Sequence, residues 1–185
     1  MNNPVRAWVQ RHYEARLLEE LGGTLEEQRV MEIGCGRGVG IEILLARFGA
    51  RQVVAFDADP AMVALARRRI TGNRADLAVA DAAAVPAGDG AFDAVVDFGS
   101  IHHVSDWRSA VAEVGRVLRP GGRFYFEEAT SRALGRWVYR TFLDHPQDRF
   151  SAEQFVGELG RHGISVPRTV EWFFGDFIIG VGVRR

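Results

Sequence analysis

The sequence predicts an α/β protein with a mostly parallel sheet and helices on both faces. Short apolar runs rich in Val and Ile alternate with segments of helical period from residue 30 to residue 126. This alternation is typical of βαβ units, whose strands are parallel. The chain has 185 residues, of which 47% are hydrophobic, enough for one core and too few for two full domains. We therefore expect a single domain over residues 1–185.

The N-terminal segment, residues 1–23, is predicted to be a helix. Asn3 precedes Pro4, and this pair is typical of an N-cap followed by proline at the first helical position. Gly22 and Gly23 then end the helix. Its predicted apolar stripe consists of Val5, Trp8, Val9, Leu17, Leu18 and Leu21.

The first strand is predicted over residues 30–33 and leads into a glycine loop, residues 34–40, with glycine at every second position. Glycines let the backbone turn tightly and let a ligand approach the main chain. The helix that follows, residues 41–48, offers unpaired N–H groups to an anionic group. A dinucleotide fingerprint needs a small residue where this loop has Val39 or Ile41, which disfavours a nicotinamide site.

The second and third strands are each predicted to end at an aspartate. Residues 52–56 lead into Asp57, and residues 77–80 lead into Asp81. Asp59 and Pro60 open the helix between these strands, which extends to residue 70. A loop is expected over the alanine-rich residues 82–90.

The fourth and fifth strands are predicted over residues 92–98 and 124–127. Ser105-Asp106 caps the helix between them, residues 107–118. The segment 119–122 reads Arg-Pro-Gly-Gly and predicts a type II turn, because proline suits its second position and glycine its third.

Beyond residue 128 the pattern changes. A helix is expected over residues 133–143, and Ser151 with Gln154 forms a capping box that opens a helix to about residue 162. Residues 168–174 and 177–183 are predicted to form an antiparallel hairpin joined at Gly175-Asp176.

Ligands of parallel sheets bind beyond the carboxyl ends of the strands, so the strand ends supply the candidate site residues. Asp57 can accept hydrogen bonds from the hydroxyl groups of a ribose. Its alternative role is an Asx turn or helix cap, for which Asp59 is better placed. The whole set is Glu32, Gly34, Gly36, Asp57, Asp81, Asp97 and the segment Gly99–His103.

The acidic-x-Gly-x-Gly-x-Gly motif from Glu32 to Gly38 resembles the first motif of the class I S-adenosylmethionine-dependent methyltransferases. Residues 92–96, 99–104 and 118–124 resemble later motifs of the small-molecule enzymes of this family, of the kind called methyltransferase type 11. The resemblance covers residues 30–126 in order. It implies a Rossmann-like, seven-stranded sheet ending in an antiparallel pair, with S-adenosylmethionine as cofactor and S-adenosylhomocysteine as product.

The resemblance also implies roles for the strand ends. Glu32 lies near the amine of the cofactor, Asp57 binds the ribose, and Asp81 with the N–H of Ala82 meets the adenine. Phe56, Met62 and Val85 are candidates for the faces of the adenine, although each suits the core equally. The expected cofactor-binding residues are Glu32, Gly34, Cys35, Gly36, Gly38, Asp57, Ala58, Met62, Asp81, Ala82, Asp97 and Phe98.

His102 and His103 are candidate catalytic bases, should the acceptor need deprotonation, because imidazole titrates near neutrality. The alternative is that one histidine lines the pocket and the other packs under a helix. A substrate lid is expected from residues 1–23 and 129–150. Its aromatic residues, which could equally be core residues, are Trp8, His12, Tyr13, Trp137, Tyr139, Phe142 and His145.

Composition argues against several other classes. The net charge is −1, without the basic excess of nucleic-acid binders. The single cysteine, Cys35, excludes an internal disulfide and a cysteine-rich zinc site, and no cluster of metal-ligand spacing is present. With no apolar run of about 18 residues, we expect neither a membrane span nor a signal peptide, and hence a cytoplasmic protein.

The predicted function is methyl transfer to a small-molecule acceptor by in-line displacement. The alternatives are a non-catalytic module that binds S-adenosylmethionine or S-adenosylhomocysteine, and a methyltransferase directed at lipid or RNA. After strand four, Asp97-Phe98-Gly99-Ser100 lacks the Asp/Asn-Pro-Pro-aromatic motif of enzymes that methylate base amino groups.

Overall fold

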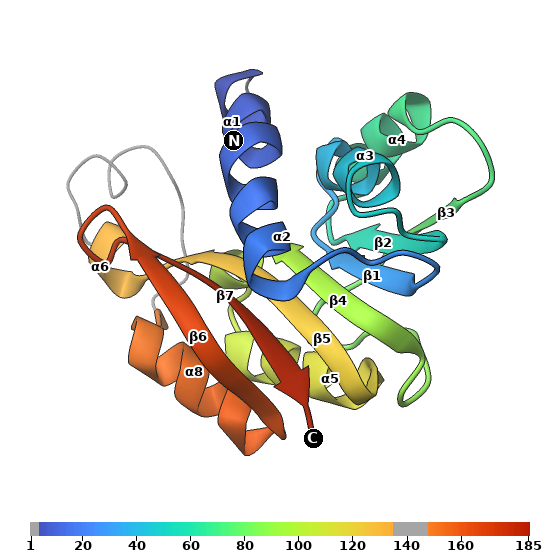
Figure 1. The fold of residues 1–185 in the computed structure, drawn as a ribbon. Coiled ribbons are helices and arrows are strands. Elements are labelled where there is room, and N and C mark those ends of the chain that lie inside the picture. Colours follow the sequence, from blue (N-terminus) through green and yellow to red (C-terminus); the bar gives the residue numbers. More distant parts are fainter. Residues whose placement is uncertain (1–3, 135–147) are drawn as a thin grey trace.

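The computed structural model describes residues 4–134 and 148–185, which form a seven-stranded sheet flanked by helices (Figure 1). The strand order is β3-β2-β1-β4-β5-β7-β6. Strands β1 to β5 are parallel, whereas β7 is antiparallel to both β5 and β6. This confirms the predicted fold class. The strands are β1 Arg29–Ile33, β2 Gln52–Asp57, β3 Ala75–Val79, β4 Phe92–Phe98, β5 Leu118–Ala129, β6 Ile164–Trp172 and β7 Phe177–Arg184.

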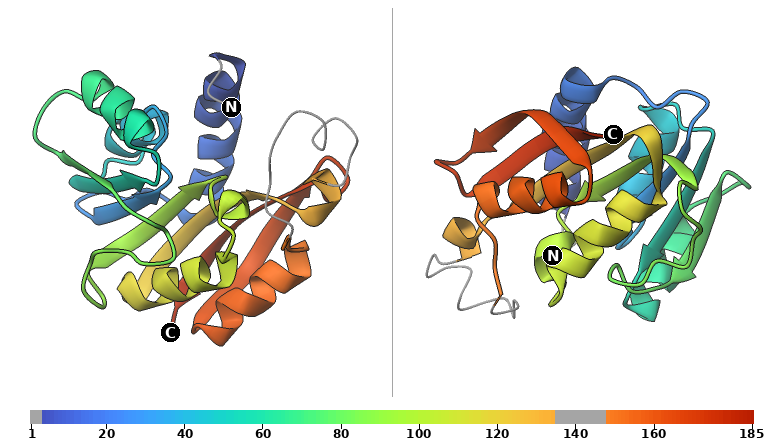
Figure 2. Two further views of the ribbon diagram at one scale, coloured as in Figure 1. Left: turned by 180° about the vertical axis from the view of Figure 1, so that it is seen from behind. Right: turned by 90° about the horizontal axis from the view of Figure 1, so that it is seen from below.

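Two helical layers cover the sheet (Figure 2). The helices are α1 Pro4–Val9, the π-helix η1 Gln10–Glu14, α2 Ala15–Gly22, α3 Val39–Ala46, α4 Pro60–Arg69, the 3₁₀ turn η2 Ile101–His103, α5 Trp107–Val117, α6 Ser131–Leu134 and α8 Ala152–Arg161. Strand β5 shows how one strand serves both layers. Phe124 and Phe126 pack in the core under α5 and α8, whereas Tyr125 packs in the core under α2 and α3.

Local sequence signals explain where the helices begin. The Asp59 side chain accepts a hydrogen bond from the N–H of Ala61 and caps α4, as predicted. Ser151 and Gln154 form the predicted capping box of α8. Gly121, inside the first part of β5, has the positive φ of 75° that the third position of a type II turn requires.

The N-terminal helix differs from its predicted pattern. Its middle turn, η1, is a π-helix, and this turn buries Gln10 and Glu14. Arg6, Gln10 and Glu14 recur at every fourth position, so they share one face of the helix. Trp8, which we assigned to the apolar stripe, is 61% exposed. The stripe was wrong at this position because buried ion pairs, which hydrophobic periodicity does not detect, orient the helix.

The C-terminal hairpin is confirmed, with different bounds. Strand β6 begins at Ile164, and the turn comprises residues 173–176, so Phe173 and Phe174 belong to the turn and not to the strand. Phe150, at the end of the expected lid segment, packs in the core against Trp107 and Phe155. Trp137, Tyr139, Phe142 and His145 lie outside the described residues.

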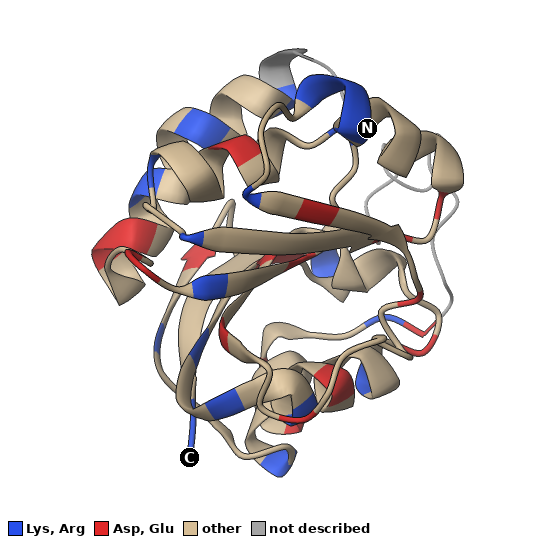
Figure 3. Ribbon diagram, turned by 90° about the vertical axis from the view of Figure 1, so that its right-hand side faces the viewer, with Lys and Arg blue, Asp and Glu red and all other residues tan. Residues whose placement is uncertain are grey.

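The surface carries both charges. Figure 3 shows Arg positions interspersed with Asp and Glu positions over the helices and strand ends. None of the helices among the described residues is long and apolar enough to cross a membrane.

Candidate functional site

A cavity of about 990 Å³ opens at the carboxyl ends of β1, β2 and β4, between the N-terminal helix and helices α3 and α4. It brings together most of the residues predicted from the sequence. These are Glu32, Gly34, Cys35, Gly36, Asp57, Ala58, Met62, Asp81, Ala82, Phe98, His102 and His103. Gly38 and Asp97 are not among the lining residues.

Packing explains three of the glycines in the loop after β1. A Cβ atom on Gly34 would clash with the Ser100 hydroxyl, and one on Gly40 would clash with the Glu32 carboxyl. Gly38 caps α3 and faces Ala66 of α4, so it supports the loop from behind. The small residues therefore let β1, α3 and the β4 loop approach closely, and they hold the loop backbone at the cavity wall.

Two aspartates lie at strand ends, as predicted. The Asp57 carboxylate accepts hydrogen bonds from the N–H groups of Gly36 (2.9 Å) and Asp59 (3.0 Å). These contacts fix the orientation of the carboxylate beside the glycine loop. Asp81 is exposed at the cavity rim and accepts a hydrogen bond from the N–H of Ala83 at 2.9 Å.

Glu32 lies at the bottom of the cavity with only 2% of its surface exposed. Its Oε2 atom has no hydrogen-bond partner among the described residues. Burial raises the pKa of Glu32 well above its usual range, and the charges of Asp97 and Asp57 raise it further. A buried carboxyl group of this kind requires either a proton or a cation.

Asp97 is completely buried behind the cavity wall and not on it, contrary to the expectation of direct cofactor contact. Its Oδ1 atom accepts a hydrogen bond from the N–H of Ser100 at 2.8 Å. Burial raises its pKa. Asp97 thus shapes the loop that carries His102 and His103.

His102 forms a pair with Glu128, a residue that the sequence analysis did not select. The His102 Nδ1 atom lies 2.5 Å from Glu128 Oε2, and Glu128 Oε1 accepts a hydrogen bond from the N–H of Ile101 at 2.7 Å. Burial lowers the pKa of His102 to about 4 and raises the pKa of Glu128 to about 7. Between pH 4 and pH 7 the imidazole and the carboxylate together hold one added proton, so the pair has no net charge.

His103 follows on the exposed side of the same turn. Its ring centroid lies 4.1 Å from that of His102, and both residues line the cavity. The pairing of His102 with the buried Glu128 carboxyl group orients its ring, which makes His102 a well-positioned candidate base.

The N-terminal helix contributes Arg6 and Gln10 to the cavity lining, two residues that the sequence analysis did not select. Arg6 donates hydrogen bonds to Glu14 at 2.5 Å and to Glu127 of β5 at 2.9 Å. Burial raises the pKa of Glu127 to about 8, although the charge of Arg6 lowers it. The signal in the sequence was the polar spacing of Arg6, Gln10 and Glu14 within an otherwise amphipathic helix.

Trp8, His12 and Tyr13, the expected lid residues of this helix, do not line the cavity. The helix turns its charged face toward the cavity, so the lid role of these three residues stays a prediction. Burial raises the pKa of the Cys35 thiol to about 12, which leaves it as a packing residue. No group of His, Cys, Asp and Glu among the described residues could hold a metal ion.

Comparison with protein families identifies the domain type. Residues 31–126 match the family model described as "Methyltransferase domain". This segment runs from β1 into β5 and includes the ends of β1, β2, β3 and β4 at the cavity.

Individual proteins agree. A probable S-adenosylmethionine-dependent methyltransferase of Mycolicibacterium smegmatis is 37% identical over 183 residues, 96% of this chain and 67% of that protein. A fatty-acid O-methyltransferase of the same organism is 34% identical over 138 residues, 74% of this chain and half of that protein (50%). The methyltransferase in complex with the Trm112 activator of Haloferax volcanii superposes with a TM-score of 0.83 at 18% identity, covering 99% of this chain and 98% of that one.

The His102–Glu128 pair predicts how stability depends on pH. The folded-state pKa of Glu128, about 7, lies above its unfolded value, so this residue stabilises the fold at low pH and loses that contribution as pH rises through 7. Between about pH 6.5 and 8 the loss is roughly 1 kcal/mol, or about 2–4 °C in Tm. Glu128→Gln keeps a hydrogen-bonding side chain and removes the titration.

Thermal unfolding of the wild type and of Glu128→Gln across this interval measures the difference. We expect Tm to fall with rising pH in both proteins, since other buried carboxyl groups remain, and to fall less steeply in the variant. Equal slopes would show that Glu128 holds no proton at neutral pH.

Proposed function

The chain belongs to the class I S-adenosylmethionine-dependent methyltransferases, and we propose that it transfers a methyl group to a small-molecule acceptor by in-line displacement. The observation that carries the proposal is the buried Glu32 carboxyl just before the glycine loop, whose Oε2 atom has no hydrogen-bond partner among the described residues. S-adenosylmethionine carries an ammonium and a sulfonium, and its ammonium would match the charge of Glu32.

The other groups of the cofactor also find suitable partners in the cavity. We propose that the loop backbone at the start of α3 binds its carboxylate and that Asp57 binds the ribose hydroxyls. Asp81 and the N–H of Ala82 would recognise the edge of the adenine. Phe56 and Met62, both in the cavity wall, would cover its faces.

In the methyl-transfer step the protein mainly positions the acceptor. S-adenosylmethionine, when bound, supplies a methyl group that is already activated by the sulfonium. The cavity walls hold the acceptor in line with that methyl group and exclude water, so catalysis arises from proximity and orientation.

His102 would remove a proton from an acceptor hydroxyl. Nδ1 faces Glu128, so Nε2, on the opposite side of the ring, is the atom that would take the proton. This requires an ionised Glu128 that accepts a hydrogen bond from Nδ1–H and leaves Nε2 with its lone pair. The pair must therefore lose its extra proton before it can act as a base.

A lipid acceptor is the second candidate, because a relative is named as a fatty-acid O-methyltransferase. The match covers half of that relative, so its name supports a small or lipid-like acceptor without identifying the substrate. A module that binds the cofactor without transferring a methyl group is the outcome if no acceptor class is methylated in a labelled-methyl screen.

Asp57→Ala tests the cofactor site. Loss of charge-assisted hydrogen bonds to the ribose should weaken binding of S-adenosylhomocysteine by roughly 30- to 300-fold in calorimetric titration. Asp59→Ala is the matched control, since Asp59 caps α4 from an exposed position and does not line the cavity. It should cost about 1 kcal/mol of stability and leave affinity within about twofold. Equal losses in both variants, or tighter binding of NADH, would refute the assignment.

His102 predicts a pH-dependent rate. With a hydroxyl acceptor found in the labelled-methyl screen, kcat should rise as pH increases through about 7, where Glu128 ionises. His102→Asn should lower kcat by about 10²–10⁴ while affinity for S-adenosylhomocysteine stays within a few fold. His162→Asn, remote on the C-terminal side of α8, is the control. A loss of kcat in His103→Asn but not in His102→Asn would assign the base role to His103. Full activity in both variants would show that neither histidine acts as the base.

A further inference from the structure

The turn between β6 and β7 is built from residues that do not favour its backbone. Phe173 and Phe174 have positive φ values of 49° and 59°, followed by Gly175 at 87°. Bulky side chains rarely adopt this left-handed conformation, which costs roughly 1–2 kcal/mol per residue. Asparagine and glycine would form the same turn without that cost. Strain of this kind is commonly retained where the side chains serve a function.

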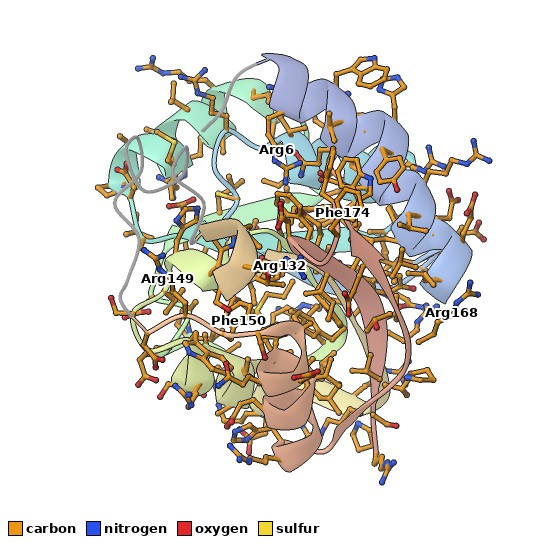
Figure 4. The ribbon with its side chains drawn as sticks, turned by 90° about the vertical axis from the view of Figure 1, so that its left-hand side faces the viewer. Arg6, Arg132, Arg149, Phe150, Arg168 and Phe174 are labelled. Carbon is orange, nitrogen blue, oxygen red and sulfur yellow. The ribbon has the colours of Figure 1, made fainter. Side chains whose placement is uncertain are left out.

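The two side chains are also exposed. Phe173 is 54% and Phe174 is 85% exposed, the latter the largest exposure among the large hydrophobic residues described. Figure 4 shows Phe174 at the tip of the hairpin, on the surface that faces the viewer. The turn therefore combines backbone strain with apolar surface in water, and packing among residues 4–134 and 148–185 explains neither.

A continuous row of rings connects this tip to the cavity. Phe177, the first residue of β7, lines the cavity beside Ala129. Its ring centroid lies 6.1 Å from that of Trp172 and 6.5 Å from that of Phe173. Trp172 in turn stacks on Tyr13 of η1 at 4.5 Å. We call these four rings, together with the exposed ring of the adjacent Phe174, the aromatic strip: Tyr13, Trp172, Phe173, Phe174 and Phe177.

The two ends of the cavity differ in chemistry. The proposed cofactor residues, among them Asp57 and Asp81, lie at the carboxyl ends of β2 and β3. Phe177 and Ala129 lie at the far side, where β5 meets β7. An acceptor that approached from that side would pass from the strip into the cavity that His102 lines.

We propose that the aromatic strip binds the hydrocarbon tail of the acceptor, so that the acceptor is an amphiphile with its reacting head in the cavity. The inference rests on the proposed methyl transfer. The acceptor tail is the expected occupant of the strip, because the strip is continuous with the cavity wall through Phe177. Burial of the tail against the rings supplies binding energy that a small polar head alone does not provide.

Primary 1-alkanols of about six to ten carbons are the probe, since a hydroxyl is the smallest neutral head. Binding is measured by calorimetry with and without saturating S-adenosylhomocysteine. In the wild type, Kd should fall by roughly two- to threefold per methylene group, less than for full burial because the strip is open on one side. A Kd that does not change with chain length would overturn the proposal.

The double variant Phe173→Asn/Phe174→Gly separates function from structure, because Asn and Gly suit the positive φ values. We expect Tm to stay level or rise, while the longest alkanol binds about tenfold more weakly and the dependence on chain length flattens. Val183→Ser, exposed at the opposite end of β7, is the control and should leave the alkanol series unchanged. An unchanged series in the double variant would overturn the proposal.

Two further arms distinguish the sources of failure. Wild-type protein that binds phosphatidylcholine vesicles through Phe173 and Phe174 but no monomeric alkanol would make the turn a membrane contact and overturn the tail site. The alkanol series without cofactor reports on the strip alone. Failure to bind S-adenosylhomocysteine, with the series intact, would therefore refute the proposed function and leave the tail site standing.

Discussion

Burial of carboxyl groups at one edge of the sheet is the constraint on which the rest of the site depends. Glu32 lies near the end of β1, Asp97 near the end of β4, and Glu127 and Glu128 near the end of β5, all with less than 5% of their surface exposed. Water does not solvate the negative charge of these buried groups, so each needs a proton, a hydrogen-bond donor or a cation. The partners of these carboxyl groups come from neighbouring elements and hold those elements in place. Arg6 of the N-terminal helix binds Glu127, and His102 with the η2 backbone binds Glu128. For Glu32 the cofactor would be the partner.

The position of the N-terminal helix follows from that constraint. Arg6 lies between Glu14 of its own helix and Glu127 of β5, so an ion-pair cluster, and not only apolar packing, determines which face turns inward. The π-helical turn at Gln10–Glu14 places Glu14 against Arg6. The outward face then carries Trp8, while Tyr13 meets Trp172 of the C-terminal hairpin. The charge cluster thereby holds the N-terminal helix against β5 at the cavity.

Much of the architecture was predictable because it depends on local signals. Alternating apolar runs, glycine turns and helix caps are read within a few residues, and the predicted strands β1, β2 and β4 match the structure to within one residue at each end. The strand-end aspartates Asp57 and Asp81 were equally accessible, because a parallel sheet brings its carboxyl ends to one edge. Gly38 and Asp97 were misjudged because motif position does not reveal which side of a wall a residue occupies.

By itself, the sequence determined the fold class and the glycine loop, since these follow from spacing along the chain. The cofactor type was implied by the resemblance of its motifs to those of a known family. The tertiary structure alone decided the pairing of His102 with Glu128 and of Arg6 with Glu127, and it placed Phe177 in the cavity wall next to the strained turn. The partners in these pairs lie 26 and 121 positions apart, and the state of each group depends on burial. Burial is a property of the packed molecule, so the local sequence pattern around a residue does not predict it.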